Sequence, residues 1–210
     1  AARAYLACNI ELDKAIGVLL QKLEETGHDK DTVIMLAPDH YPYGLDTESL
    51  NALAGKQLDQ FSLYQSCFLI WSADMEGPVV IDKPVSSLDI LPTVSNLFDL
   101  EYDSRLMMGA DMLSDTQSPV IFQDHSWLTA YGCYDAAKDH YTSFIDTGDD
   151  ENYVQSMNYQ VDQKFTYSKL ILRKDLYRQI WDDAGLWPGE EPDPEPAPAP
   201  ATPTEPPATP

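Results

Sequence analysis

The chain is poor in basic residues. Its 210 residues include 13 Lys and Arg against 35 Asp and Glu, which gives a formal net charge of -22. Residues 188–210 hold five of the acids and no base, so residues 1–187 still carry 30 acids against 13 bases. This balance excludes the binding of nucleic acid or an anionic membrane surface through a basic face, and it favours cations as partners.

Cysteine is also scarce. Cys8, Cys67 and Cys133 are widely spaced and form no C-x-x-C pair. This arrangement excludes a disulfide framework and a zinc knuckle, and it leaves room for one disulfide at most. Cys8 and Cys67 have apolar neighbours in the sequence, so we expect them to be small core residues.

No apolar run approaches the roughly 20 residues that span a bilayer. The chain begins inside a helical pattern, without an initiator Met or a signal peptide, so we interpret it as part of a longer protein. The 43% of hydrophobic residues are enough for the core of one domain over residues 1–187. Residues 188–210 contain ten prolines and predict a disordered, Pro/Glu/Thr-rich tail.

The strongest local signal is an apolar run that ends at a polar pair. Val33–Leu36 are four consecutive apolar residues, followed after Ala37 and Pro38 by Asp39 and His40. A short apolar run bounded by turn residues predicts a strand buried on both faces, because Pro38 leaves too little length for a helix. Ligands of open α/β sheets bind beyond the carboxyl ends of strands, and a carboxylate beside an imidazole can hold a divalent metal ion.

The dipeptide Asp-His occurs three times, and its context separates the three copies. Asp124-His125 also follows a strand-like run, 120–122, whereas Asp139-His140 lies in a polar stretch. We expect Asp124-His125 not to bind the metal of Asp39 and His40, although it could line the same site. Asp139-His140 is expected to be a solvated surface pair.

Helical and apolar segments alternate along the chain, which predicts an α/β fold with a mainly parallel sheet flanked by helices. The segment containing Tyr134, Tyr141 and Phe144 suggests a further strand or loop. The expected helices cover residues 4–26, 88–98 and 165–181, with weaker helical patterns at 46–61 and 153–163, and the expected strands cover 33–36, 68–71 and 119–122.

Several of these segments, in matching order, resemble the lipoteichoic acid synthase-like family, which comprises sulfatase-type phosphoglycerol transferases of the alkaline phosphatase superfamily. The resemblance covers about residues 4–181 and corresponds to the C-terminal half of the catalytic domain. The segments are Asp13-Lys-Ala-Ile-Gly17, Thr32-Val-Ile-Met-Leu36, Asp39-His-Tyr-Pro-Tyr-Gly44, Phe68-Leu-Ile-Trp71, Leu88-Asp-Ile-Leu-Pro-Thr93 with Asn96-Leu-Phe98, and Met108-Gly-Ala-Asp-Met-Leu113.

The resemblance implies an enzyme at the extracytoplasmic face of the membrane, anchored by an N-terminal region. It implies a divalent metal, typically Mn²⁺, with Asp39 and His40 as two of its ligands. A threonine nucleophile would take glycerol phosphate from phosphatidylglycerol, an anionic phospholipid. That threonine and a glutamate ligand belong to the N-terminal half of the domain, so Thr32 and Thr93 are expected to be structural. Pro38 departs from the small residue that the family has before the aspartate.

Two other functions stay open at this stage. The chain could belong to a hydrolase of the same superfamily, a sulfatase or phosphodiesterase, and the nucleophile would decide between the two reactions. It could also be a non-catalytic remnant. If the protein is a transferase or a hydrolase, the 210 residues alone are expected to bind Mn²⁺ weakly and to show no turnover, since a catalytic site needs three or more protein ligands.

Overall fold

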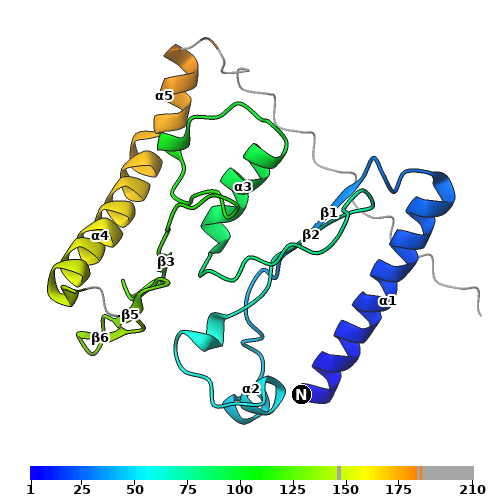
Figure 1. Ribbon diagram of the computed structural model, residues 1–210, viewed down its shortest axis with the longest axis horizontal. Coiled ribbons are helices and arrows are strands. Elements are labelled where there is room, and N and C mark those ends of the chain that lie inside the picture. Colours follow the sequence, from blue (N-terminus) through cyan, green and yellow to red (C-terminus); the bar gives the residue numbers. More distant parts are fainter. Residues whose placement is uncertain (146–147, 184, 186–210) are drawn as a thin grey trace, which may run out of the picture. The chain divides into compact units, whose positions relative to one another are not determined.

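A computed structural model describes residues 1–145, 148–183 and 185 of the chain (Figure 1). The predicted tail over residues 188–210 lies outside the described residues. The described residues form two compact units. The first comprises Ala1–Val85, Met112–Val120 and Leu128–Ala130, and the second comprises Ser86–Asp111, Ile121–Trp127 and the described residues from Tyr131 onward.

The first unit opens with the long helix α1 (Ala2–Thr26), close to the predicted 4–26. Gly27 ends it in the left-handed conformation at φ 70°, where glycine lacks the steric cost of a Cβ atom. The elements that follow are β1 (Val33–Leu36), α2 (Thr47–Ala54), the 3-10 helix η1 (Ser62–Tyr64) and β2 (Leu69–Ser72).

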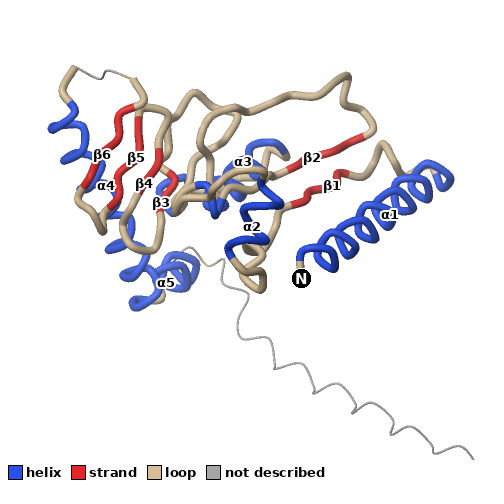
Figure 2. The backbone as a smooth tube through the Cα atoms, turned by 90° about the horizontal axis from the view of Figure 1, so that it is seen from below, coloured by secondary structure: helices blue, strands red, loops and turns tan. Residues whose placement is uncertain are grey.

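The predicted strand at Val33–Leu36 is confirmed as β1, but a mainly parallel sheet is not. β1 and β2 pair antiparallel, with Val33 opposite Ser72 and Leu36 opposite Leu69. Figure 2 shows the two strands side by side. A parallel pair needs a crossover connection, usually a helix packed on the sheet. The only α-helix between these strands, α2, has eight residues and contacts α1, so the connection returns the chain antiparallel.

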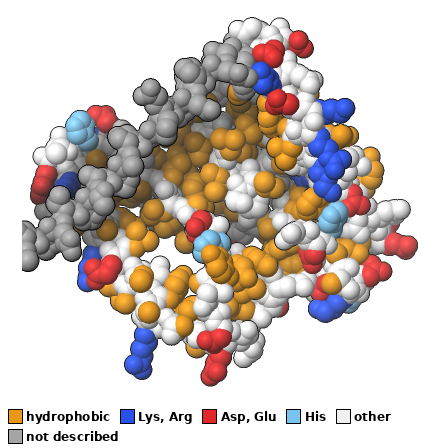
Figure 3. Space-filling view, turned by 180° about the vertical axis from the view of Figure 1, so that it is seen from behind, with side chains coloured by type: hydrophobic (Ala, Val, Ile, Leu, Met, Phe, Trp, Pro, Cys, Tyr) orange, Lys and Arg blue, Asp and Glu red, His pale blue; other side chains and the backbone are white. Residues whose placement is uncertain are grey.

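The first unit leaves much apolar surface uncovered. None of the 25 residues of α1 is buried, and Leu12 of α1 and Leu69 of β2 are both more than half exposed. Figure 3 shows many apolar side chains, in orange, on the displayed face of the molecule. The expectation that Cys8 and Cys67 are core residues is wrong: both are exposed free thiols, and Cys8 lies on α1, which has no buried residue.

Antiparallel strands also build the sheet of residues 120–143, which has the order β3-β4-β5-β6. β5 and β6 form a hairpin in which Asp135 pairs with His140 and Gly132 with Ser143. The hairpin confirms a strand in the segment of Tyr134 and Tyr141. The strands are β3 (Val120–Ile121), β4 (Trp127–Leu128), β5 (Gly132–Asp135) and β6 (His140–Ser143).

The remaining helices belong to the second unit. Sequence patterns predicted separate helices at 153–163 and 165–181, but α4 is one helix through Phe165 and α5 follows directly. The elements are the 3-10 helices η2 (Ser87–Asp89) and η3 (Ser104–Leu106), and the α-helices α3 (Ile90–Leu97), α4 (Asp150–Lys174) and α5 (Leu176–Asp183).

The core of the second unit lies between α4 and the strands. Trp127 is fully buried against Met157 and Val161 of α4, and its indole N–H donates to Asn158 Oδ1 at 2.8 Å. Partly buried aromatic rings surround this cluster, Tyr134 and Tyr153 among them. Burial of a large indole ring explains why α4 continues through Tyr- and Asn-containing sequence that disfavours a helix on propensity alone.

A buried carboxylate connects two segments of the second unit. Asp89 is 2% exposed, and its oxygens accept the N–H groups of Ser86 and Ala110, both at 2.7 Å. Gly109 is adjacent to this contact, and a Cβ atom there would lie 2.1 Å from the carbonyl oxygen of Leu88. Side-chain–backbone bonds from Lys164 to Met108 and from Tyr177 to Leu106 hold the same loop, and burial lowers the pKa of Lys164.

Gly109→Ala should therefore destabilise the protein, by about 1–3 kcal/mol, because the backbone of Leu88 must move to admit the methyl group. Urea unfolding followed by circular dichroism measures this loss. The matched control is Gly17→Ala in α1, where a Cβ atom would meet nothing within 4 Å and helix propensity should add about 0.5–1 kcal/mol. Equal stability of the two variants would contradict the close packing at Gly109.

Candidate metal centre

The loop after β1 presents two potential metal ligands side by side. Asp39 Oδ2 and His40 Nε2 lie 3.4 Å apart, and their side chains are 87% and 48% exposed. This separation is longer than the 2.7–3.2 Å of a typical N–H···O hydrogen bond. The exposed carboxylate and the half-exposed imidazole lie beyond the carboxyl end of β1, as the sequence predicted.

The other ring nitrogen of His40 is already engaged. Its Nδ1 lies 2.8 Å from the carbonyl oxygen of Tyr41. A carbonyl only accepts hydrogen bonds, so Nδ1 carries the proton in the neutral imidazole and Nε2 keeps its lone pair. Metal-binding histidines commonly have this arrangement, in which the second nitrogen donates to a backbone carbonyl or carboxylate.

The two atoms fit adjacent positions on one metal ion. Nitrogen and oxygen ligands bind Zn²⁺ at about 2.0–2.2 Å, and a tetrahedral angle then separates two ligands by about 3.4 Å. The Nε2–Oδ2 distance of 3.4 Å agrees with this spacing. A carboxylate and a neutral imidazole also suit ions of intermediate hardness such as Mn²⁺ and Zn²⁺.

Aromatic rings surround His40. The ring of Tyr43 lies 4.4 Å from the imidazole between centroids, and Tyr41 contacts Tyr64 of η1 edge to face at 5.1 Å. Sequence reasoning missed this group of rings and assigned no role to Tyr41 or Tyr43. The signal was present in the two tyrosines on either side of Pro42, directly after the predicted ligands.

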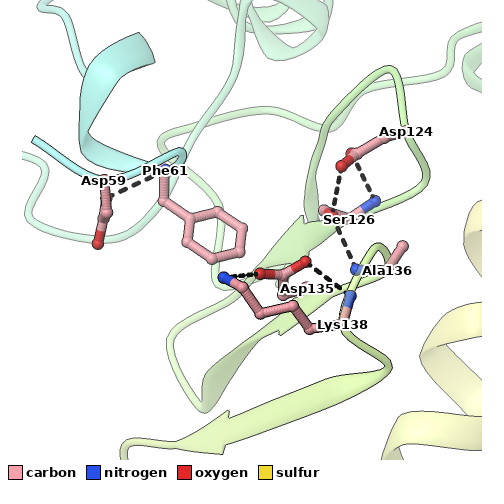
Figure 4. Close-up of polar contacts among 7 residues, drawn as sticks. All are labelled: Asp59, Phe61, Asp124, Ser126, Asp135, Ala136 and Lys138. Atoms are coloured by element: carbon pink, nitrogen blue, oxygen red, sulfur yellow. Dashed lines mark hydrogen bonds and ion pairs between the residues drawn. The ribbon is translucent and has the colours of Figure 1, made fainter. Parts of the chain in front are cut away.

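The second Asp-His pair lies in a tight turn of the second unit. Asp124 accepts hydrogen bonds from the N–H and hydroxyl of Ser126, at 3.0 and 2.9 Å, and the Ser126 hydroxyl oxygen accepts the N–H of Ala136 (Figure 4). His125 has a left-handed backbone at φ 67°. Asp124 therefore has a structural role in this turn.

The His125 side chain packs on α4. Its Nδ1 lies 2.7 Å from Asp162 Oδ1, and its ring stacks on Phe165 at 4.2 Å between centroids with an interplanar angle of 7°. One ring face and one ring nitrogen are thus occupied within the second unit. These contacts favour a structural role, and the sequence prediction that His125 is not a ligand of the Asp39–His40 metal remains a prediction.

The third pair lies on the β5–β6 hairpin. Tyr134 donates its hydroxyl to Asp139 Oδ1 at 2.7 Å, which raises the pKa of Tyr134, and His140 begins β6. At the same hairpin, Asp135 and Lys138 form an ion pair at 2.7 Å (Figure 4). These contacts stabilise the turn, and the exposed His140 agrees with the expectation of a surface pair.

Asp39 and His40 by themselves do not complete a metal site. Within residues 1–145, 148–183 and 185, no three His, Cys, Asp or Glu side chains are grouped closely enough to hold an ion. An open groove of the first unit, of about 690 Å³, is lined by α1, β2 and the segment to Pro78 and not by the Asp39–His40 pair.

None of the described helices has the length and apolar character needed to cross a bilayer.

Comparison with known proteins relates part of this chain to a family. Residues 1–100, which include Asp39 and His40, match the family described as Sulfatase. The chain is 29% identical over 131 residues to a lipoteichoic acid synthase of Staphylococcus saprophyticus, covering 60% of the chain and 20% of that protein. It is 22% identical over 135 residues to the steryl-sulfatase of Mus musculus, covering 58% of the chain and 21% of that protein.

Residues 1–100 thus match the Sulfatase family, and the similarity to a lipoteichoic acid synthase agrees with the resemblance carried by the sequence segments. It spans about a fifth of the length of the curated relatives it matches. The activities that the names of those relatives state are therefore only proposed for this protein.

His125→Asn should leave Mn²⁺ binding by the 210-residue chain unchanged within about twofold, because asparagine tolerates the left-handed backbone and His125 is not a ligand. Paramagnetic broadening of NMR signals during a Mn²⁺ titration measures the affinity. His40→Ala is the positive control and should abolish the binding. A folded His125→Asn protein that no longer binds Mn²⁺ would show that His125 belongs to the site.

Proposed function

We propose that this chain is part of a metal-dependent phosphoglycerol transferase that acts on phosphatidylglycerol in the synthesis of a lipoteichoic acid-like polymer of the cell envelope. The observation that carries the proposal is the pairing of Asp39 Oδ2 and His40 Nε2 at 3.4 Å, within the segment that matches the sulfatase family. The similarity to a lipoteichoic acid synthase supports phosphoglycerol transfer over other reactions of the family.

Asp39 and His40 would hold a divalent metal, which we propose to be Mn²⁺. When bound, the ion supplies positive charge that favours a deprotonated hydroxyl nucleophile and offsets the charge of the attacked phosphoryl group. Asp39 provides an anionic oxygen, and His40 provides a nitrogen lone pair oriented by the Tyr41 carbonyl. The net charge of -22 makes such a cation more important for an anionic lipid headgroup, because the protein itself repels that substrate.

The proposal places the remaining groups outside these 210 residues. A catalytic metal site needs at least three protein ligands and an open position, and the pair provides two. The nucleophilic threonine and a further ligand would come from the N-terminal half of the same domain. That half would also cover apolar side chains such as Leu12 of α1 and Leu69 of β2, which are 56% and 54% exposed. The proposed location is the extracytoplasmic face of the membrane, with the anchor in that N-terminal region.

A second candidate is a hydrolase of sulfate or phosphate esters. The match to the Sulfatase family and the similarity to a steryl-sulfatase favour it. The same ligand pair would serve both reactions, because in each a nucleophile attacks the tetrahedral centre of an anionic ester. The acceptor distinguishes them: water in the hydrolase, and a hydroxyl group of the growing polymer in the transferase.

The test uses the longer protein to which this chain is proposed to belong, with fluorescent phosphatidylglycerol and an aryl sulfate as parallel substrates. Asp39→Ala and His40→Ala should each reduce phosphoglycerol transfer more than about a hundredfold, since even outer-shell changes at metal sites cost about 10- to 100-fold. Asp124→Ala is the matched control in another Asp-His pair and should retain transfer. Retained transfer without Asp39 or His40 would refute the site, and turnover of the sulfate ester alone would favour the hydrolase.

The 210-residue chain alone should bind Mn²⁺ weakly and turn over neither substrate. Calorimetric titration and the same two assays measure this. Micromolar affinity with metal-dependent turnover would show that these residues suffice and that the nucleophile lies within them.

A further inference from the structure

The turn after His40 contains a feature that the proposed function does not require. The N–H of Tyr43 donates to the carbonyl oxygen of Tyr41 at 2.7 Å, a bond that spans two residues and closes a γ-turn centred on Pro42. Proline suits this position, because its ring holds φ near about -65° and the common inverse γ-turn needs about -75°. The residue type at 42 therefore stabilises the turn.

The same carbonyl oxygen accepts a second bond. His40 Nδ1 lies 2.8 Å from it, so the γ-turn and the imidazole share one acceptor. A carbonyl oxygen has two lone pairs and can serve both donors. Because the turn fixes the direction of the Tyr41 carbonyl, it also fixes which nitrogen of His40 carries the proton.

The turn places an aromatic ring beside the imidazole as well. The rings of Tyr43 and His40 are 4.4 Å apart between centroids, at an interplanar angle of 46°. Tyr43 is 66% exposed, so the ring is not held there by burial in a core. The opposite side of the turn is fixed by Tyr41, whose ring contacts Tyr64 edge to face at 5.1 Å.

From these contacts we infer that Pro42 and Tyr43 are positioning residues for His40: the γ-turn holds the imidazole as the Nδ1–H tautomer, and the Tyr43 ring keeps Nε2 beside Asp39. The tautomer is a property of the metal-free chain, whereas its use in metal binding rests on the proposed function. Neither residue would touch the ion itself.

The first measurement is the tautomer of His40 in the metal-free 210-residue chain, read from the ¹⁵N chemical shifts of the two ring nitrogens at a pH where the ring is neutral. The wild-type chain should show protonated Nδ1. Pro42→Gly and Tyr43→Ala should move the population toward protonated Nε2, while Tyr43→Phe, which keeps the ring, should resemble the wild type. Tyr159→Ala is the matched control, because Tyr159 is also 66% exposed but lies on α4.

The second measurement is Mn²⁺ affinity, from paramagnetic broadening of the His40 ring signals. Pro42→Gly and Tyr43→Ala should weaken binding about 10- to 100-fold, the usual range for partners that orient a ligand, and Tyr43→Phe should restore it. Circular dichroism shows whether each variant is folded.

The two measurements distinguish the positioning of His40 from the binding of a metal ion. Protonated Nε2 in the wild type, or folded Pro42→Gly and Tyr43→Ala chains with unchanged tautomer and affinity, would overturn the positioning role. The expected tautomer pattern in a wild-type chain that binds no Mn²⁺ would support the positioning of His40 and contradict the proposed metal site.

Discussion

Pairing between β1 and β2 is the interaction on which the candidate site depends. The two short strands fix the point at which the chain leaves the sheet, and Asp39 and His40 follow β1 after Ala37 and Pro38. The backbone then turns back at Pro42, and the Tyr41 carbonyl meets the imidazole. A strand end followed by a hydrogen-bonded turn thus brings a carboxylate oxygen and an imidazole nitrogen to the spacing of two ligands on one ion.

The two units differ in how they are stabilised. The second has a core of Trp127, Met157 and Val161 and a buried carboxylate, Asp89, with backbone partners. The first contains the ligand pair but leaves every residue of α1 unburied. Exposed apolar surface on this scale marks an interaction face. The proposed N-terminal half of the domain would cover it, and that cover would complete the site at the same time.

The sequence predicted local features well where one short segment determines them. The run Val33–Leu36 is a strand, the helix ending at Gly27 is present, and the Asp-His pair follows a strand end. The assignment of that pair as metal ligands stays a prediction. Strand direction was not predictable in this way, because it depends on how the connection through α2 packs. The continuity of α4 was missed since burial against Trp127 outweighs its weak helix propensity. The role of the Tyr41 carbonyl was missed because every residue has a backbone carbonyl, so the sequence does not mark this one.

The proposed function requires that Asp39 and His40 share one metal ion. Pulsed electron paramagnetic resonance of the Mn²⁺-loaded chain tests it most directly, since a nitrogen bound to Mn²⁺ gives a measurable hyperfine coupling. A shared ion should give a single histidine nitrogen coupling that disappears in His40→Ala and persists in His28→Ala. A coupling that survives His40→Ala, or bound Mn²⁺ with no nitrogen coupling, would contradict it.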